Sequence, residues 1–127
     1  MNEQDLNDSK GTISINLVHE ALLSAQHQGL NTQSILLKSG IPLELMQSSK
    51  ARVSVSQYAQ LWIELADAMN DEFFGMDSHP MRRGSFKLLS QSVMYAETLK
   101  HAVQHILQFL NLVLDDFISQ LFVQENY

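Results

Sequence analysis

Two histidines at helical spacing are the residues of this chain best placed to do chemistry. His101 and His105 stand four positions apart in HAVQH, so that two imidazoles on one helix could share a metal ion. The glutamate of a metalloprotease motif is missing between them, and no third ligand follows at a recognisable spacing. Both lie on the polar side of the helix with Gln104 and Gln108. We interpret them as part of a solvated helix face, with a metal-binding protein using His101 and His105 as an alternative.

Adjacent carboxylates are a second candidate for chemistry. Asp71-Glu72 and Asp115-Asp116 could work as acid–base pairs, but neighbours in a helical sequence point in different directions. We interpret both pairs as solvated surface at helix ends. The sequence has no GxSxG, P-loop or GxGxxG pattern to support nucleophilic hydrolysis or nucleotide chemistry. We therefore expect no enzyme, no catalytic residue, no metal ligand and no cofactor.

The stretch NTQSILLKSGIPLELMQS has the outline of a DNA-reading helix-turn-helix, because a glycine-containing turn separates two short helical segments. A recognition helix usually brings cations to phosphate and guanine. The second segment offers Glu44, Met46 and Gln47, and no arginine or lysine before Lys50. Packing of two short helices is a sufficient explanation, and a stand-alone DNA-binding module using residues 31–48 is kept as an alternative function.

Aromatic residues are concentrated in SQYAQLWIELADAMNDEFFGM, residues 56–76. This stretch carries the only tryptophan, Trp62, and ends in Phe73-Phe74 followed by glycine. Ordinary core is the simplest interpretation. The alternative is the wall of a small-molecule pocket or a partner surface, where aromatic residues are also enriched. Phe109 and Leu112 favour the alternative, since they fall outside the main apolar arc of the last helix and need cover from elsewhere.

Composition and charge narrow the class of protein. The chain has 127 residues, 45% apolar and 17% charged, which suits one globular domain. It has no cysteine, which excludes disulfides and thiolate chemistry and fits a reducing compartment. No apolar run approaches the roughly 18 residues of a membrane span, and the polar start MNEQDLNDSKG lacks signal-peptide features. We expect a cytoplasmic protein without a membrane contact.

The net charge of −6, from 8 basic and 14 acidic residues, disfavours nucleic-acid binding by this chain alone. Contacts to phosphate supply most of the affinity of a protein that binds nucleic acid, and they need a basic face. The nearest approach to one is the cluster of Arg82, Arg83 and Lys87, which is too small to hold a duplex.

Apolar periodicity and capping residues predict a mainly α fold, a compact bundle of five to six helices with a short C-terminal β-strand. Residues 1–12 are expected to form a flexible tail, and residues 13–116 a helical domain. The predicted N-caps are Ser14, Asn31 or Thr32, Ser54 (with Gln57 in a capping box), Ser85 and Thr98. The predicted helices cover about residues 14–28, 32–39, 42–48, 55–69, 85–94 and 98–117.

Three of these helices carry an apolar face at three- and four-residue spacing. The first has Ile15, Val18, Ala21, Leu22 and Ala25. The helix from residue 55 has Val55, Tyr58, Ala59, Trp62, Leu65, Ala66 and Met69. The last helix has Leu99, Ala102, Val103, Ile106, Leu107, Leu110, Val113 and Leu114.

The final segment, FISQLFVQENY, changes from helical to strand character. It is rich in β-formers, and Phe117, Leu121 and Val123 alternate imperfectly with polar residues. A lone strand leaves its backbone groups unpaired, so it needs a neighbour. Either this strand pairs with its copy across a dimer, or the chain is cut where a sheet should begin.

Three stretches together resemble a known family. They are the early helix with GLNTQSILLKSGIP, then ARVSVSQYAQLWIELADAMNDEFFGM, and then GSFKLLSQSVMYAETLKHAVQHILQFLNLVLDD. In order and spacing they are similar to the N-terminal effector-sensing and dimerisation domain of AraC-family transcription regulators, in the subgroup with a helical, arabinose-binding-like domain. The residues that match the family pattern are Arg52, Ser54, Leu61, Trp62, Asp71, Phe74, Gly75, Met76 (where Leu is usual), Gly84, Phe86, Thr98, Leu99 and Ala102. The resemblance covers roughly residues 13–116.

The resemblance implies that residues 13–116 form the regulatory domain of a bacterial transcription factor. Such a domain senses a small-molecule effector, dimerises, or does both, and thereby biases a DNA-binding domain. Members of the family continue through a small sheet-containing part into a basic domain with two helix-turn-helix units. We therefore expect a homodimer, a truncated β segment at residues 117–127, and DNA contact only through a C-terminal domain absent from this chain. No ligand-binding residue is assigned.

Overall fold

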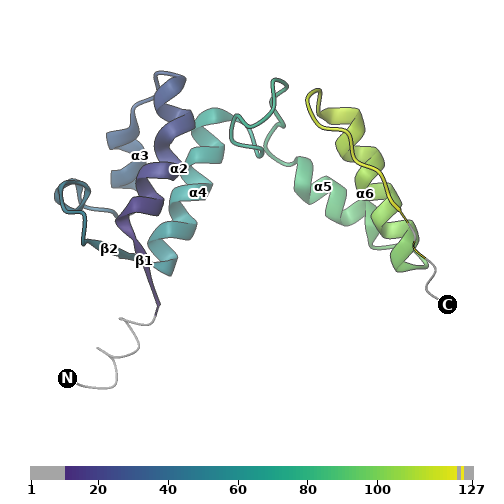
Figure 1. Ribbon diagram of the computed structural model, residues 1–127, viewed down its shortest axis with the longest axis horizontal. Helices are drawn as coiled ribbons and strands as arrows, with labels where there is room; N and C mark the ends of the chain where they lie inside the picture. The colour runs from purple at the N-terminus through teal and green to yellow at the C-terminus, as the bar shows by residue number, and fades with distance from the viewer. Residues whose placement is uncertain (1–10, 123, 125–127) are drawn as a thin grey trace. The chain divides into compact units, whose positions relative to one another are not determined.

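A computed structural model describes residues 11–122 and 124 of the chain (Figure 1). This described part contains five α-helices, one 3-10 helix and two short strands, which confirms the mainly α class and the number of helices predicted. Contacts divide the chain into two units, residues 1–69 and residues 70–127. Each unit is described by itself. The expected helical domain, residues 13–116, spans both units, and its boundaries stay a prediction.

In the first unit, three helices lie side by side and a small sheet lies beside them (Figure 1). The elements are β1 (Thr12–Ser14), α2 (Ile15–His27), α3 (Thr32–Lys38), the 3-10 helix η1 (Leu43–Gln47), β2 (Arg52–Ser54) and α4 (Val55–Met69). The core of this unit is apolar and is built from α2, α3, β2 and α4, with Ile41 from the turn between α3 and η1. The other core residues are Ile15, Val18, Leu22, Ala25, Ile35, Leu36, Val53, Leu61, Leu65 and Ala66.

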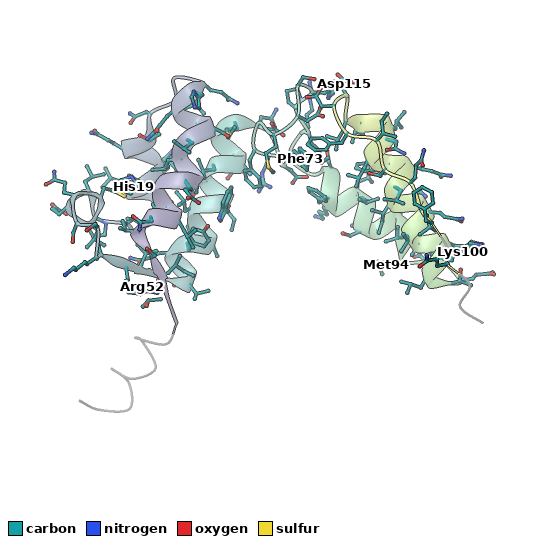
Figure 2. The ribbon with its side chains drawn as sticks, in the orientation of Figure 1. His19, Arg52, Phe73, Met94, Lys100 and Asp115 are labelled. Carbon is teal, nitrogen blue, oxygen red and sulfur yellow. The ribbon has the colours of Figure 1, made fainter. Side chains whose placement is uncertain are left out.

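Helix α2 follows its sequence signals closely. Ser14 caps it, its hydroxyl accepting a hydrogen bond from the Asn16 N–H at 3.3 Å. Five apolar residues predicted for its inner face are all buried. The helix ends before Gly29, which has the left-handed φ of +74° expected of a glycine after a helix. A side chain from the outer face, His19, places Nε2 3.1 Å from the Met46 carbonyl oxygen and thereby links α2 to η1 (Figure 2).

Strands β1 and β2 were missed by the sequence interpretation. They pair antiparallel, with Ile13 opposite Val53. Arg52 strengthens the pair, because its Nε donates to Thr12 Oγ1 at 2.7 Å and its Nη2 to the Thr12 carbonyl oxygen at 2.9 Å (Figure 2). The prediction of a flexible tail over residues 1–12 is thus wrong at Thr12, which lies in a strand; residues 1–10 lie outside the described residues.

Helix α4 begins with the predicted capping box. The Gln57 N–H donates to Ser54 Oγ at 3.1 Å, and the Ser54 N–H donates to Gln57 Oε1 at 2.7 Å. The buried face agrees with the predicted stripe at Leu65 and Ala66, but it also includes Leu61, whereas Val55 at the start of the stripe is 54% exposed.

The second unit contains a loop, a helical hairpin and an extended C-terminal segment. Helices α5 (Ser85–Val93) and α6 (Leu99–Val113) contact each other, and residues 117–122 run back along α6 (Figure 1). Thr98 caps α6, its hydroxyl accepting from the His101 N–H at 3.1 Å, but the helix ends at Val113, four residues earlier than predicted.

The expected C-terminal strand is not found in the described residues of this segment, 117–122 and 124, whose other positions (123 and 125–127) lie outside the description. Its backbone is held differently. Asn111 on α6 donates from Nδ2 to the Ser119 carbonyl oxygen at 2.8 Å and accepts from the Ser119 N–H at 2.7 Å. A side-chain amide therefore takes the place that a neighbouring strand would fill.

Candidate functional site

The loop between residues 70 and 84 is organised by the buried carboxylate of Asp71. Its Oδ1 accepts hydrogen bonds from the N–H groups of Phe73 and Met81, both at 2.9 Å, and its Oδ2 accepts from Gly75 N–H at 2.8 Å. These bonds surround Phe74, which has a φ of +56°, a conformation that a bulky residue rarely adopts. Asp71 is only 3% exposed. Its interpretation as solvated surface was therefore wrong, although its role is to hold the loop and not to transfer protons.

A second buried carboxylate, Asp77, joins this loop to the end of α6. Its Oδ1 accepts from the Asp116 N–H at 2.7 Å, and its Oδ2 accepts from the N–H groups of Asp115 and His79 at 3.0 and 2.8 Å. Burial raises the pKa of Asp77, but these three backbone donors and the charge of nearby His79 outweigh it and hold the pKa below its usual value. The carboxylate is thus kept ionised as a structural acceptor.

Asp116 completes the same junction from the opposite side. Its carboxylate accepts from Ser78 N–H at 2.7 Å and from Ser78 Oγ at 2.9 Å. Phe117 adds an apolar contact, with its ring edge-on to the Phe73 ring at a centroid distance of 5.4 Å. Sequence interpretation missed Asp77 altogether. The available signal was the Asp-Ser-His order, since an Asp that bonds the N–H two residues on makes an Asx-turn.

Glu72, not Ser85, caps helix α5. Its Oε1 accepts from the Phe86 N–H at 2.8 Å and its Oε2 from the Gly84 N–H at 3.2 Å, which satisfies donors at the helix start. Gly84 is the residue before the helix and has a φ of +99°. Arg83 Nη1 donates to Glu72 Oε2 at 2.9 Å. The charge of the basic cluster Arg82, Arg83 and Lys87 is thus partly neutralised by Glu72. This makes the cluster still less suited to binding phosphate.

The histidine pair does not assemble a metal site with other described residues. His105 Nε2 lies 2.9 Å from Ser92 Oγ, so this imidazole links α6 to α5. Among residues 11–122 and 124, no group of three or more histidine, aspartate and glutamate side chains could hold a metal ion. No carboxylate of the described part of the chain hydrogen-bonds the His105 imidazole, and Ser92 Oγ donates to the Leu89 carbonyl oxygen at 2.7 Å. We interpret the Ser92–His105 contact as a hydrogen bond between helices.

The helix-turn-helix outline at residues 31–48 is not completed in the structure. Its first part is α3, capped by Asn31 Oδ1, which accepts from the Ser34 N–H at 3.1 Å. Its second part is η1, a 3-10 helix of five residues. A recognition element is an α-helix long enough to present several side chains to the major groove. The five residues of η1 do not provide one, so the alternative of a stand-alone DNA-binding module loses its structural basis.

Unit 2 leaves a large part of its apolar side chains uncovered. No residue of α6 is buried, and Leu89 is the only one of α5 that is. Leu112 is 83% exposed, as expected from its position outside the main apolar arc. The turn between the helices adds Met94 and Tyr95, which are 73% and 87% exposed. Extensive exposed apolar surface marks a site of contact with another molecule or domain. We take this surface as the candidate functional site.

Two open hollows flank this surface. One, of about 480 Å³, lies between α6 and residues 119–121, and carboxamides line it, including those of Gln104, Gln108 and Gln120. Carboxamides donate and accept hydrogen bonds without charge, so they suit a neutral polar ligand. The other, of about 430 Å³, lies at the start of α5 and includes Arg83 and Lys87.

Comparison with known proteins identifies the family. Residues 29–126 match the family model described as the arabinose-binding domain of AraC transcription regulator, N-term. The chain belongs to this family. A search of curated proteins and a search of solved structures found no match. The AraC-type match begins after α2 and continues through α6, so it includes parts of both units.

Most residues that carry the AraC-type resemblance have a structural role. Ser54 belongs to the capping box of α4, Asp71 holds the loop, and Gly84 precedes α5 with a left-handed φ. Thr98 caps α6. Arg52 binds Thr12 across the sheet. The family pattern thus records how turns and helix starts are built, and it does not point to a ligand.

Membership of the AraC-type family makes this chain a regulatory N-terminal domain. The family consists of ligand-binding domains of transcription regulators and is not an enzyme family. In the described residues, no helix is both long and apolar enough to cross a membrane.

Proposed function

We propose that this domain senses a small-molecule effector, dimerises, or does both, and that it thereby biases a DNA-binding domain encoded beyond these residues. The observation that carries the proposal is the family match over residues 29–126, combined with the uncovered apolar surface of α5 and α6. A regulatory domain acts by contact with another molecule, and such a surface is what a contact needs. Because a transcription regulator works on DNA, the proposal also implies that the domain acts in the bacterial cytoplasm.

The first part of the proposal, here called the effector arm, is that the domain senses a small molecule. Such a ligand must bind two arrangements of the protein with different affinities, since equal affinity shifts no equilibrium. The carboxamide-lined hollow beside α6 supports a neutral polar ligand. The description of the family names arabinose, so sugars are the first class to try. The net charge of −6 disfavours a strongly anionic effector on the same grounds that it disfavours DNA.

Thermal unfolding with a panel of metabolites tests the effector arm. A ligand that binds the folded chain raises the melting temperature in proportion to the logarithm of its concentration above its dissociation constant. We expect a neutral sugar to do so, and Gln104→Ala with Gln108→Ala to reduce the rise. Gln33→Ala, an exposed amide on α3, is the matched control.

The second part of the proposal, here called the dimer arm, is that the domain dimerises. Light scattering at micromolar concentration tests it, and we expect a mass of twice the 14.4 kDa chain. A chain that stays monomeric at every concentration and that no metabolite stabilises contradicts the proposed function as a whole. A dimer, or stabilisation by a metabolite, would each be consistent with the proposed function.

A further inference from the structure

The segment that follows helix α6 is fastened to its own unit at two points. This segment, residues 115–121, is here called the C-terminal strap, and from residue 117 it runs back along α6 (Figure 1). At its start, the N–H groups of Asp115 and Asp116 donate to the carboxylate of Asp77, which is only 7% exposed. Hydrogen bonds to an ionised acceptor that is shielded from water are strong, so the start of the strap is firmly anchored.

The second fastening depends on one side chain, that of Asn111 on α6. Its Nδ2 donates to the Ser119 carbonyl oxygen at 2.8 Å, and its Oδ1 accepts from the Ser119 N–H at 2.7 Å. This pair of bonds is here called the clasp. Asn111 is exposed, and neither partner carries a charge, so water competes for both bonds. The clasp is therefore the weaker attachment, and the strap can leave α6 there while its start stays bound to Asp77.

The amide-lined hollow of about 480 Å³ lies at the clasp. Helix α6 forms one wall of the hollow with Gln104, Gln108 and Asn111, and residues 119–121 of the strap form the other. The hollow consequently exists only while the strap lies on α6. A molecule that fills it contacts both walls, so it binds the arrangement with a closed clasp better than one with an open clasp.

The residues of the two walls define which kind of molecule suits the hollow. None of the lining side chains in the described part of the chain carries a charge, because they are carboxamides, one serine hydroxyl and two leucines. Carboxamides and hydroxyls both donate and accept hydrogen bonds, which matches a molecule with several hydroxyl groups. A phosphorylated or carboxylated molecule would bring a charge that no lining residue compensates.

We propose that a neutral polyhydroxylated molecule in this hollow holds the C-terminal strap on α6, and that the position of the strap is the signal which the domain passes on. This inference rests on the effector arm of the proposed function and assigns the moving element to it. The DNA-binding domain of that proposal is encoded beyond these residues, so the chain reaches it through the strap. Coupling of this kind is reciprocal, and whatever pulls the strap off α6 weakens binding of the molecule by the same factor.

Hydrogen exchange of the parent chain, followed amide by amide, tests the clasp directly. The first probe is L-arabinose, since the family description names arabinose. At about ten times its dissociation constant, we expect the Ser119 amide to exchange roughly tenfold more slowly, because this amide exchanges only after the strap has opened and the sugar has left. The amides of Asp115 and Asp116 should keep their rates, since Asp77 holds them with or without the sugar. Ribose 5-phosphate, the charged comparison, should leave all three rates unchanged.

A disulfide across the clasp separates the position of the strap from the direct contact of Asn111 with the sugar. The variant carries Asn111→Cys and Ser119→Cys, and the chain has no cysteine of its own to interfere. The Asn111 side chain reaches the backbone of residue 119, which is the proximity that a bridge needs. We expect the oxidised variant to bind L-arabinose at least about tenfold more tightly than the reduced variant, in which the clasp is lost.

Oxidised and reduced forms contain the same residues, so their difference in affinity reports the strap alone. The parent chain treated with the same oxidant is one control, because it has no thiol to react. Gln91→Ala, which removes an exposed amide of α5 in the same unit, is a second control and should bind L-arabinose as the parent does. The exchange measurement needs no variant, so it decides the question even if the cysteine pair impairs folding.

Three results overturn the inference. A sugar that stabilises the chain but leaves exchange of the Ser119 amide unchanged binds elsewhere, which rejects the inference and keeps the effector arm. Equal affinity of the oxidised and reduced forms, or cysteines that do not bridge, shows that the molecule does not hold the strap. Protection by ribose 5-phosphate as strong as that by L-arabinose, or no binding of any neutral sugar, rejects the assigned ligand class. The proposed function survives each of these results if the chain dimerises or another metabolite stabilises it.

Discussion

Asp77 and Asp116 hold each other's segments in place through backbone bonds that run in both directions. The Asp116 N–H donates to the Asp77 carboxylate at 2.7 Å, and the Asp116 carboxylate accepts from the N–H of Ser78, the residue after Asp77, at 2.7 Å. The 70–84 loop is thereby fastened to the end of α6. Both acids act as acceptors for backbone donors, so replacing either one should change stability and not catalysis.

The pKa of Asp77 predicts how the second unit responds to acid. Because the folded-state pKa lies below its ordinary value, the ionised carboxylate stabilises the fold. That contribution is complete above the unfolded pKa of about 3.9 and is lost as pH falls through the folded value. We expect Asp77→Asn to lower stability at pH 7 and to flatten the acid part of the profile. Urea unfolding across pH checks this.

Asp115→Asn is the matched control for that measurement, since it removes one charge at the same junction from a residue that takes part through its N–H. We expect Asp115→Asn to keep the acid-dependent loss of the parent chain. Equal profiles for the two variants would show that net charge, and not the hydrogen bonds to Asp77, sets the acid response.

Replacing Asp71 should loosen the 70–84 loop. Asp71→Ala leaves the N–H groups of Phe73, Gly75 and Met81 without their acceptor, and an unsatisfied buried donor costs about 1–3 kcal/mol. Asp71→Asn keeps one oxygen and should cost less. Hydrogen exchange at these three amides measures the effect directly. Unchanged protection in Asp71→Ala would contradict the role assigned to this carboxylate.

The capping box predicts a coupled effect at the start of α4. Ser54→Ala and Gln57→Ala should each destabilise the first unit by about 1 kcal/mol, since each removes one of two reciprocal bonds. Gln57 should cost more, because its Nε2 also donates to the Gly40 carbonyl oxygen at 2.7 Å. Thermal unfolding of the double variant should show less than the sum. Gln33→Ala, at an exposed position of α3 in the same unit, serves as control.

Zinc should have little effect on the chain. His101 and His105 supply two imidazoles, and Nε2 of His105 is already engaged by Ser92 at 2.9 Å. We expect an unchanged melting temperature with zinc, and a loss of about 0.5–1.5 kcal/mol in Ser92→Ala from the hydrogen bond alone. A zinc-dependent rise that His105→Ala abolishes would revive the metal-binding alternative.

Helix starts were the features most readily predicted from the sequence. Ser14, Asn31, Ser54 and Thr98 all cap the helices that they were expected to cap. These signals are local, because a short side chain bonds an N–H two or three residues later. The inner face of α2 was predicted for the same reason, since its spacing alone selects the residues that meet the core.

Features that depend on distant residues could not be predicted in this way. Asp71 and Glu72 looked like surface carboxylates, and Asp77 was missed, because their partners are backbone N–H groups up to 39 positions away. The β1–β2 pair is only three residues long on each side, too short for alternation to be visible. The capping residue of α5 also differs from the predicted Ser85, because the cap is Glu72, which lies 14 positions before Phe86 in the sequence.

The short sheet has a practical consequence for anyone who wants to express a trimmed version of the protein. The Gly11 carbonyl oxygen accepts from Val55 N–H at 3.0 Å, and Thr12 receives both bonds from Arg52. In a version that starts at Ile13, the Val55 N–H and the Arg52 guanidinium would lose these acceptors and would hydrogen-bond to water instead. Any shortened clone should therefore keep Gly11, and one that starts at Ile13 is expected to melt at a lower temperature.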